Sequence, residues 1–208
     1  MTRLTISAAA LMAITTPVFA GPVAVPPPPP PVYVEPERCP LAFDCFYLGL
    51  EAGYGHGTGN QFNPAVTQGN GDTPLDYDGA VYGAFAGYNF QNGAMVYGGE
   101  VRFLHGNLSD DTPVFEVNSL IDLRGRIGYA PSDSFMVYGA LGYTLAQATA
   151  ASDFDMDGFN AGIGAEFNVS ESFFIGADLT ARQLEGTLGA FEYDADVHTA
   201  TIRAGFRF

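Results

Sequence analysis

The ionisable residues with the most regular spacing are acids and arginines two positions apart. Asp122, Arg124 and Arg126 form one such series, and Glu100 with Arg102 forms another. Side chains two apart point to the same face of an extended strand. Arginine suits pairing there, because its planar guanidinium binds a carboxylate through two hydrogen bonds. The spacing therefore predicts a network of ion pairs along one face of several strands.

A hydrolase would need a nucleophile with a base in reach. His198 has Thr199 beside it, but neighbours on a strand point to opposite faces, and position 200 is alanine rather than serine. We therefore expect a protein that is not an enzyme and has no catalytic residues.

One segment imitates the start of a calcium-binding loop. Asp153, Asp155 and Asp157 precede Gly158, as in an EF-hand, but Gly164 stands where the bidentate acid of the twelfth position belongs. The residues that follow read as a strand instead of a helix. We expect no metal site and no cofactor.

Two cysteines, Cys39 and Cys45, lie six positions apart. This spacing predicts one small disulfide loop in an oxidising compartment, and a pair of free thiols is the alternative.

The N-terminus reads as an export signal. A basic start at Arg3 precedes an apolar stretch, and Val18-Phe19-Ala20 has the small-residue pattern of a cleavage site. We expect residues 1–20 to be a signal peptide cleaved after Ala20. Residues 21–45 then form a Pro-rich periplasmic leader that includes the Cys loop. The run Pro26 to Pro31 favours an extended spacer, either a plain linker or a contact to the cell wall.

The charge balance limits the partners. The 208 residues include no lysine, eight arginines and 23 acids, which gives a formal net charge of −15. Nucleic acid and anionic membrane surfaces require a basic footprint, so neither is expected as a partner.

From Phe46 onward the chain alternates between apolar and polar residues with the period of two that marks strands. Every strand with two or more charges carries them all on one parity. The expected strands are 46–54, 80–90, 95–103, 117–129, 135–145, 159–167, 173–182 and 199–208.

Two observations indicate that the apolar face points outward, into lipid. Large aromatics, such as Phe46, Tyr129 and Phe167, lie where strands meet short turns or a terminus, as in the aromatic girdle of an outer-membrane barrel. Connections after the second, fourth and sixth strands are short, whereas the others span roughly ten to 25 residues, as in such barrels. Arginine facing the bilayer midplane costs about 2–4 kcal/mol, so the charges must point inward.

Three segments carry a resemblance to a known family. Phe46-Tyr-Leu-Gly-Leu-Glu-Ala-Gly-Tyr-Gly, Gly87-Tyr-Asn-Phe and Leu123-Arg-Gly-Arg-Ile-Gly-Tyr-Ala resemble the small opacity-type surface antigens, relatives of the OmpA transmembrane domain. The last strand ends in phenylalanine and resembles the signal by which outer-membrane barrels are recognised for assembly, with the apolar positions Ile202, Ala204, Phe206 and Phe208.

The resemblance and the patterning predict an all-β fold, an eight-stranded antiparallel transmembrane β-barrel over residues 46–208, in the outer membrane of a Gram-negative bacterium. We expect a structural surface protein with acidic extracellular loops. Its expected partners are outer-membrane lipid, lipopolysaccharide, the barrel-assembly machinery and an extracellular ligand that the sequence does not identify. An eight-stranded lumen is just wide enough for side chains to fill it. We expect it to hold Glu51, Glu100, Arg102, Asp122, Arg124, Arg126, Glu166, Asp178, Arg182, Arg203 and Arg207.

Two alternatives remain open. A narrow passive channel is one, if the lumen charges leave a path for ions. A haemin-binding or other ligand-binding receptor is the second, because some relatives of the resembling family are implicated in haemin binding and His56 and His105 fall in expected outer loops.

Overall fold

The structure is a computed structural model that describes residues 39, 42–62, 73–109, 116–149, 152–189 and 191–208. Residues 36–208 form one compact unit. The expected signal peptide, its cleavage site after Ala20 and most of the 21–45 leader lie outside the described residues. Within the described part, no helix has the length and apolar character needed to cross a membrane.

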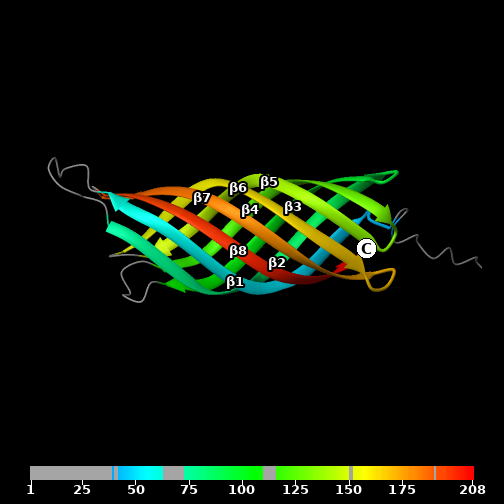
Figure 1. Ribbon diagram of the computed structural model, residues 1–208, viewed down its shortest axis with the longest axis horizontal. Helices are drawn as coiled ribbons and strands as arrows, with labels where there is room; N and C mark the ends of the chain where they lie inside the picture. The colour runs from blue at the N-terminus through cyan, green and yellow to red at the C-terminus, as the bar shows by residue number, and fades with distance from the viewer. Residues whose placement is uncertain (1–38, 40–41, 63–72, 110–115, 150–151, 190) are drawn as a thin grey trace, which may run out of the picture. The chain divides into compact units, whose positions relative to one another are not determined.

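Eight antiparallel strands close into a barrel (Figure 1). Each strand pairs with the next, and β8 pairs with β1, where the Phe208 N–H donates to the Phe46 carbonyl oxygen at 2.9 Å. Closure leaves no unpaired edge, and the expected fold class is confirmed. The strands are β1 (Phe46–Phe62), β2 (Thr73–Asn92), β3 (Met95–Ser109), β4 (Glu116–Ser132), β5 (Phe135–Thr149), β6 (Asp153–Asn168), β7 (Phe173–Leu188) and β8 (Phe191–Arg207).

The strands begin or end near the expected residues at one end of the barrel, which we call the short-turn end. The β2–β3, β4–β5 and β6–β7 turns lie there with the C-terminus (Figure 1). Gly93, in the first of these turns, has a φ of 61°, a backbone conformation that glycine adopts without a steric penalty.

At the opposite end, which we call the far end, the strands are longer than the sequence predicted. The expectation of long connections is wrong for β5–β6 and β7–β8, which are joined by residues 150–152 and 189–190 alone. The acids expected in those loops, among them Asp155 and Asp194, lie on β6 and β8 instead. His56 and His105 likewise lie on β1 and β3 rather than in loops.

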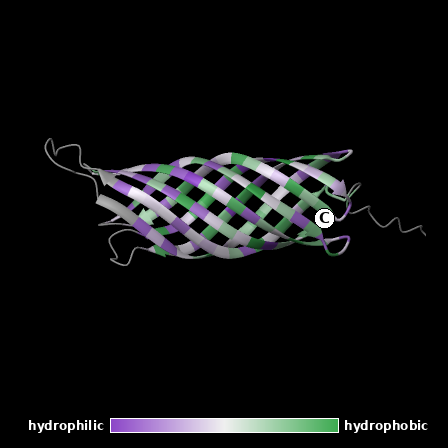
Figure 2. Ribbon diagram, in the orientation of Figure 1, coloured by the Kyte–Doolittle hydropathy of each residue, from purple (hydrophilic) through white to green (hydrophobic). Residues whose placement is uncertain are grey.

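Apolar residues alternate with polar ones along the strands (Figure 2), and the apolar residues that are exposed form a broad band on the outer face of the barrel. Exposed aliphatic residues fill the middle of the band, including Leu50, Leu123, Leu141 and Ile202. Aromatics flank it at the short-turn end, where Phe46, Phe90, Tyr129, Phe135, Phe167, Phe206 and Phe208 are exposed. Toward the far end it is bounded by Tyr54, Tyr82, Tyr143 and Phe159.

The two faces exchange character beyond the band. On β8 the inward residues are Arg203 and Thr201 within the band but Val197, Ala195 and Tyr193 beyond it. The outward residues change in the opposite sense, from Ile202 to a run of acids that are exposed: Asp196, Asp194 and Glu192. At the far end the strands therefore enclose an apolar core, as a water-soluble barrel does.

The interior is filled in three layers. An apolar cluster occupies the far end and includes Tyr77, Leu104, Leu120, Phe154 and Leu184. Charged side chains occupy the middle. A second apolar cluster closes the short-turn end and contains Phe43, Val96, Ala130, Met136 and Tyr138.

The segment preceding β1 belongs to this closure. Phe43 is fully buried, and its N–H donates to Gln91 Oε1 at 3.0 Å. The carbonyl of Cys45 accepts from the N–H of Asn89 at 3.1 Å. Cys39 and Cys45 form a disulfide that ties the segment into a small loop. Residues 42–45, which the sequence assigned to the leader, therefore pack as part of the barrel.

Candidate functional site

The candidate site is the charged middle layer of the lumen. Each acid and arginine that the sequence placed there is buried and takes part in an ion pair with another member of the set. The strands position them through a single rule: all lie on the inward parity of β1, β3, β4, β6, β7 or β8. They come together across the lumen from positions far apart in the sequence.

Arg102 on β3 is one centre of the network. Its Nε and Nη2 donate to the two oxygens of Glu51 on β1, each at 2.8 Å. Its Nη1 donates to Asp178 Oδ1 and to Thr180 Oγ1 on β7, both at 3.0 Å. One guanidinium thus links strands on opposite sides of the barrel and uses its donors on charged and neutral acceptors.

Glu100 is the second centre, and three arginines converge on it. Arg124 donates to its Oε1 at 2.6 Å, and Arg126 and Arg203 donate to its Oε2 at 2.8 and 2.6 Å. Tyr47 adds a hydroxyl hydrogen bond to Oε2 at 3.0 Å. A buried carboxylate tolerates loss of water only when its lone pairs are filled in this way.

Three further ion pairs, made by the acids Asp122 and Glu166, extend the network. Nε and Nη2 of Arg182 donate to the two carboxylate oxygens of Asp122, at 2.9 and 2.6 Å. Glu166 accepts from Arg126 and from Arg207, each at 2.5 Å. Arg207 belongs to the last strand, so the network joins the end of the chain to β4 and β6.

Six arginines face five acids in this layer, and aromatic rings take the place of a sixth acid. The guanidinium carbon of Arg203 lies 3.7 Å from the ring centre of Phe85, and that of Arg126 lies 3.8 Å from that of Tyr138. Arg207 lies 4.1 Å from the Phe174 ring centre. Among the described residues, the Nε atoms of these three arginines have no hydrogen-bond partner. The negative faces of the rings supply the attraction there instead.

Inward glycines make room for these rings. A Cβ on Gly49 would lie 2.3 Å from Cζ of Phe85, and one on Gly164 would lie 2.3 Å from the Tyr138 ring. Both distances are shorter than a Cβ atom and a non-bonded ring atom can approach each other. Glycine at these positions therefore allows large rings to share the lumen with long arginines.

Sequence reasoning missed the neutral members of the layer. Tyr47, Tyr138, Thr144, Thr180 and Thr199 donate to or accept from the charged residues. Tyr47, Thr180 and Thr199 share the parity of the charges on their strands, so the alternation held the signal for them, whereas Tyr138 and Thr144 lie on β5, which carries no charge. Phe85 is buried among inward glycines of β2 and is the ring that stacks on Arg203.

The expected assembly residues lie on the outer face of β8. Ile202, Phe206 and Phe208 are exposed and Ala204 is half-buried, so all four point away from the lumen. Thr199 is buried and its hydroxyl oxygen accepts from Arg182, whereas the adjacent His198 is exposed. The two residues weighed as a hydrolase pair therefore lie on opposite sides of the barrel wall.

The acids of the imitation calcium loop do not converge. Asp153, Asp155 and Asp157 alternate outward along β6. Among the described residues, no group of three or more histidine, cysteine or acidic side chains is arranged to hold a metal ion.

Known proteins resemble the chain over most of its length. The family model of the outer membrane protein β-barrel domain matches residues 6–208. The 31 kDa outer-membrane immunogenic protein of Brucella melitensis biotype 1 is 26% identical over 200 residues, which cover 78% of this chain and 82% of that protein. A protein of the same description from Brucella suis biovar 1 matches equally.

Two solved structures share the fold. Neisserial surface protein A superposes with a TM-score of 0.54 and 12% identity, over 78% of this chain and 97% of its own. The outer membrane protein OprG from Pseudomonas aeruginosa superposes with a TM-score of 0.52 and 12% identity, over 81% and 99%. At these identities the likeness concerns the fold alone.

Proposed function

Because this chain belongs to the outer membrane protein β-barrel domain family, we propose that it is a non-enzymatic surface barrel whose lumen is closed to ions. Its place in the outer membrane and its membership of a family of surface and porin-like barrels agree with the sequence-based expectation and are confirmed. The closed lumen and the absence of catalysis are the parts that we propose.

One observation carries the closed lumen: the buried charges are paired with one another, or stacked on aromatic rings, between two apolar layers. Glu51, Arg102 and Asp178 are each buried and bonded across the lumen. An ion crossing this layer would have to separate buried, paired charges, which is costly in a low-dielectric interior. The network is therefore better suited to holding the wall together than to conduction.

The proposal that the protein is not an enzyme rests on the same chemistry. The buried carboxylates and arginines of the lumen neutralise one another and present no open face to a substrate. Thr199, the hydroxyl residue next to His198, points inward and bonds to Arg182, so these two residues do not form a nucleophile–base pair.

We also propose the partners that the location implies. The apolar band with its two aromatic borders fits outer-membrane lipid, and the acidic outer face beyond it meets lipopolysaccharide through shared divalent cations. The outward series Ile202, Ala204, Phe206 and Phe208 is proposed as the segment that the barrel-assembly machinery recognises.

Planar bilayer recording tests the closed lumen. Purified protein, shown to be folded by its compact band on an unboiled gel, is added to one side at 1 M KCl beside a known porin as the insertion control. We expect no stepwise current from this protein. Reproducible single steps that scale with its concentration would overturn the proposal and support the narrow channel.

Absorbance spectroscopy tests the haemin-binding alternative. Haemin is titrated into the folded protein and into its His56→Ala and His105→Ala variants. We expect no saturable shift of the haem band. A shift that saturates and is lost in either variant would favour the receptor.

A further inference from the structure

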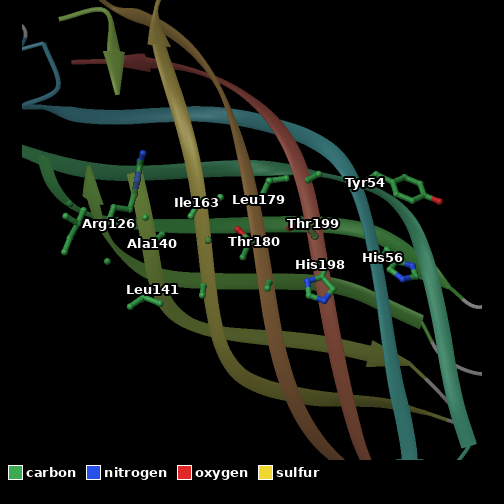
Figure 3. Close-up of a pocket in the computed structure, with 18 of the residues that line it drawn as sticks. Tyr54, His56, Arg126, Ala140, Leu141, Ile163, Leu179, Thr180, His198 and Thr199 are labelled. Carbon is green, nitrogen blue, oxygen red and sulfur yellow. The ribbon is translucent and has the colours of Figure 1, made fainter. Parts of the chain in front are cut away.

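Two histidines distant in the sequence meet on the outer face of the barrel. His56 on β1 and His198 on β8 are direct partners in the register of this strand pair. Both side chains point outward and are exposed. Figure 3 shows them on neighbouring strands, and Tyr54 lines the same pocket as both histidines. The pair forms only because β8 closes onto β1.

The spacing of the pair suits a shared metal ion. Directly opposite residues of an antiparallel pair have Cβ atoms about 4.5–5.5 Å apart. Two imidazole nitrogens bound to one tetrahedral ion at about 2.0–2.1 Å lie roughly 3.3 Å from each other. Two rings leaning toward one another from such Cβ positions reach this separation by side-chain rotation alone.

A neighbouring carboxylate lies close to one of the rings, beyond hydrogen-bond distance. Asp76 Oδ1 on β2 lies 3.7 Å from His56 Nδ1. A carboxylate facing one nitrogen of a histidine fixes the ring and leaves the other nitrogen free to bind a metal. Asp78, directly opposite His56 in the register, accepts a hydrogen bond from the Tyr54 hydroxyl and adds a second fixed negative group.

The charge around the pair favours a cation. Asp76, Asp78 and Asp196 flank it from β2 and β8, and Ala181 faces it from β7. The chain has no lysine, six of its eight arginines are buried in the lumen, and the other two, Arg3 and Arg38, lie outside the described residues. Over the described outer face, the field therefore attracts cations and repels anions.

We propose that His56 and His198 form a binding site for a divalent first-row transition metal ion. The two imidazoles supply the fixed ligands, and water completes the coordination. Imidazole prefers zinc, copper and nickel, whereas carboxylate alone prefers calcium and magnesium. The site lies just beyond Tyr54, at the edge of the apolar band, where it is open to the medium. It does not depend on the closed lumen.

Isothermal titration calorimetry tests the site. The full chain without a polyhistidine tag, folded in detergent micelles, is titrated with ZnCl2 in chelator-free buffer at pH 7.5. We expect one zinc per chain, at least a tenfold loss of affinity in His56→Ala and in His198→Ala, and about a tenfold loss in Asp76→Asn. Both cysteines are bonded to each other and offer no competing thiol.

His105→Ala is the matched control. The His105 ring lies on β3 and packs against Tyr82 on β2, and neither strand carries His56 or His198. It should bind zinc as the unchanged chain does, and tenfold excess Mg²⁺ should not displace the ion. Each variant must keep its compact unboiled band, and His→Gln replaces any alanine variant that does not. Full zinc affinity in His56→Ala and His198→Ala, or displacement by Mg²⁺, would show binding by the carboxylates alone and overturn the proposal.

Discussion

At the scale of single residues, the lumen shows how buried charge is tolerated in this barrel. Arginines outnumber acids there by six to five, and three of the guanidinium groups also stack on aromatic rings. The ring face satisfies part of the charge without adding another carboxylate that would need its own donors. Glycines on facing strands leave the space that this stacking requires.

Removing the carboxylate at the centre of the network should be costly. Glu100→Gln leaves Arg124, Arg126 and Arg203 without their shared partner, and breaking a buried pair costs about 3–5 kcal/mol. The chain has no tryptophan, so the measurement is the fraction of compact gel band against guanidinium concentration. The midpoint should fall.

Glu171→Gln, on an exposed side chain of the β6–β7 turn, is the control and should leave the midpoint unchanged. Equal midpoints for the two variants would mean that the network contributes no stability.

The sequence was sufficient to predict which charges share the lumen, because strand parity is set by a strict period of two. It could not predict which pairs form, since partners such as Glu51 and Arg102 or Asp122 and Arg182 meet across the barrel. It also could not reveal the His56–His198 pair, which depends on the register between the first and last strands.

At the scale of elements, the segment before β1 acts as a cap on the short-turn end. Phe43 lies under the guanidinium of Arg207, 4.7 Å from ring centre to guanidinium carbon, and its backbone is bonded to Gln91. The Cys39–Cys45 disulfide closes the loop that presents it. The apolar residues between the cysteines, Leu41-Ala42-Phe43, are consecutive and show no alternation, which is why the sequence pattern assigned them to the leader.

Truncating the cap should destabilise the barrel. Phe43→Ala removes a fully buried ring, and large-to-small changes of phenylalanine in a core cost about 3–5 kcal/mol. Phe90→Ala removes a ring that faces lipid and should cost clearly less. Guanidinium midpoints of the two variants in the same detergent compare them directly, and equal losses would show that Phe43 is not a packed cap.

The strand ends at the far end were mispredicted for a physical reason. Beyond the apolar band the outward positions turn acidic while the inward ones turn apolar, and the parity is unchanged. The sequence-based prediction required apolar residues at the outward positions of each strand. Acids at those positions, such as Asp153, Asp155 and Asp157, were therefore assigned to a solvated loop. At the far end the surroundings of the outer face change from lipid to water, while the backbone continues as the same strand.

At the scale of the whole molecule, the barrel joins a membrane section with charges inside to a far-end section with an apolar core. The boundary follows the ring of tyrosines that includes Tyr54 and Tyr143, whose hydroxyls donate to Asp78 and Asp157. Such residues place an apolar body toward lipid and a polar tip toward water.

A pair of arginine substitutions on β8 tests where this boundary lies. Ile202 is 73% exposed within the band, so Ile202→Arg should cost about 2–4 kcal/mol in a bilayer. Asp194→Arg, on the same outward parity beyond the band, should cost close to nothing. The difference is measured by guanidinium unfolding in lipid vesicles, and equal costs would place the lipid boundary elsewhere.

The most direct test of the central claim, a closed barrel in the outer membrane, is heat-modifiability of the chain in fractionated cells. The account predicts a protein in the outer-membrane fraction that runs as a compact band unboiled and shifts to slower migration after boiling. A protein recovered from the soluble periplasmic fraction, with the same migration before and after boiling, would contradict it. The face with the arginines would then have to be the outer one.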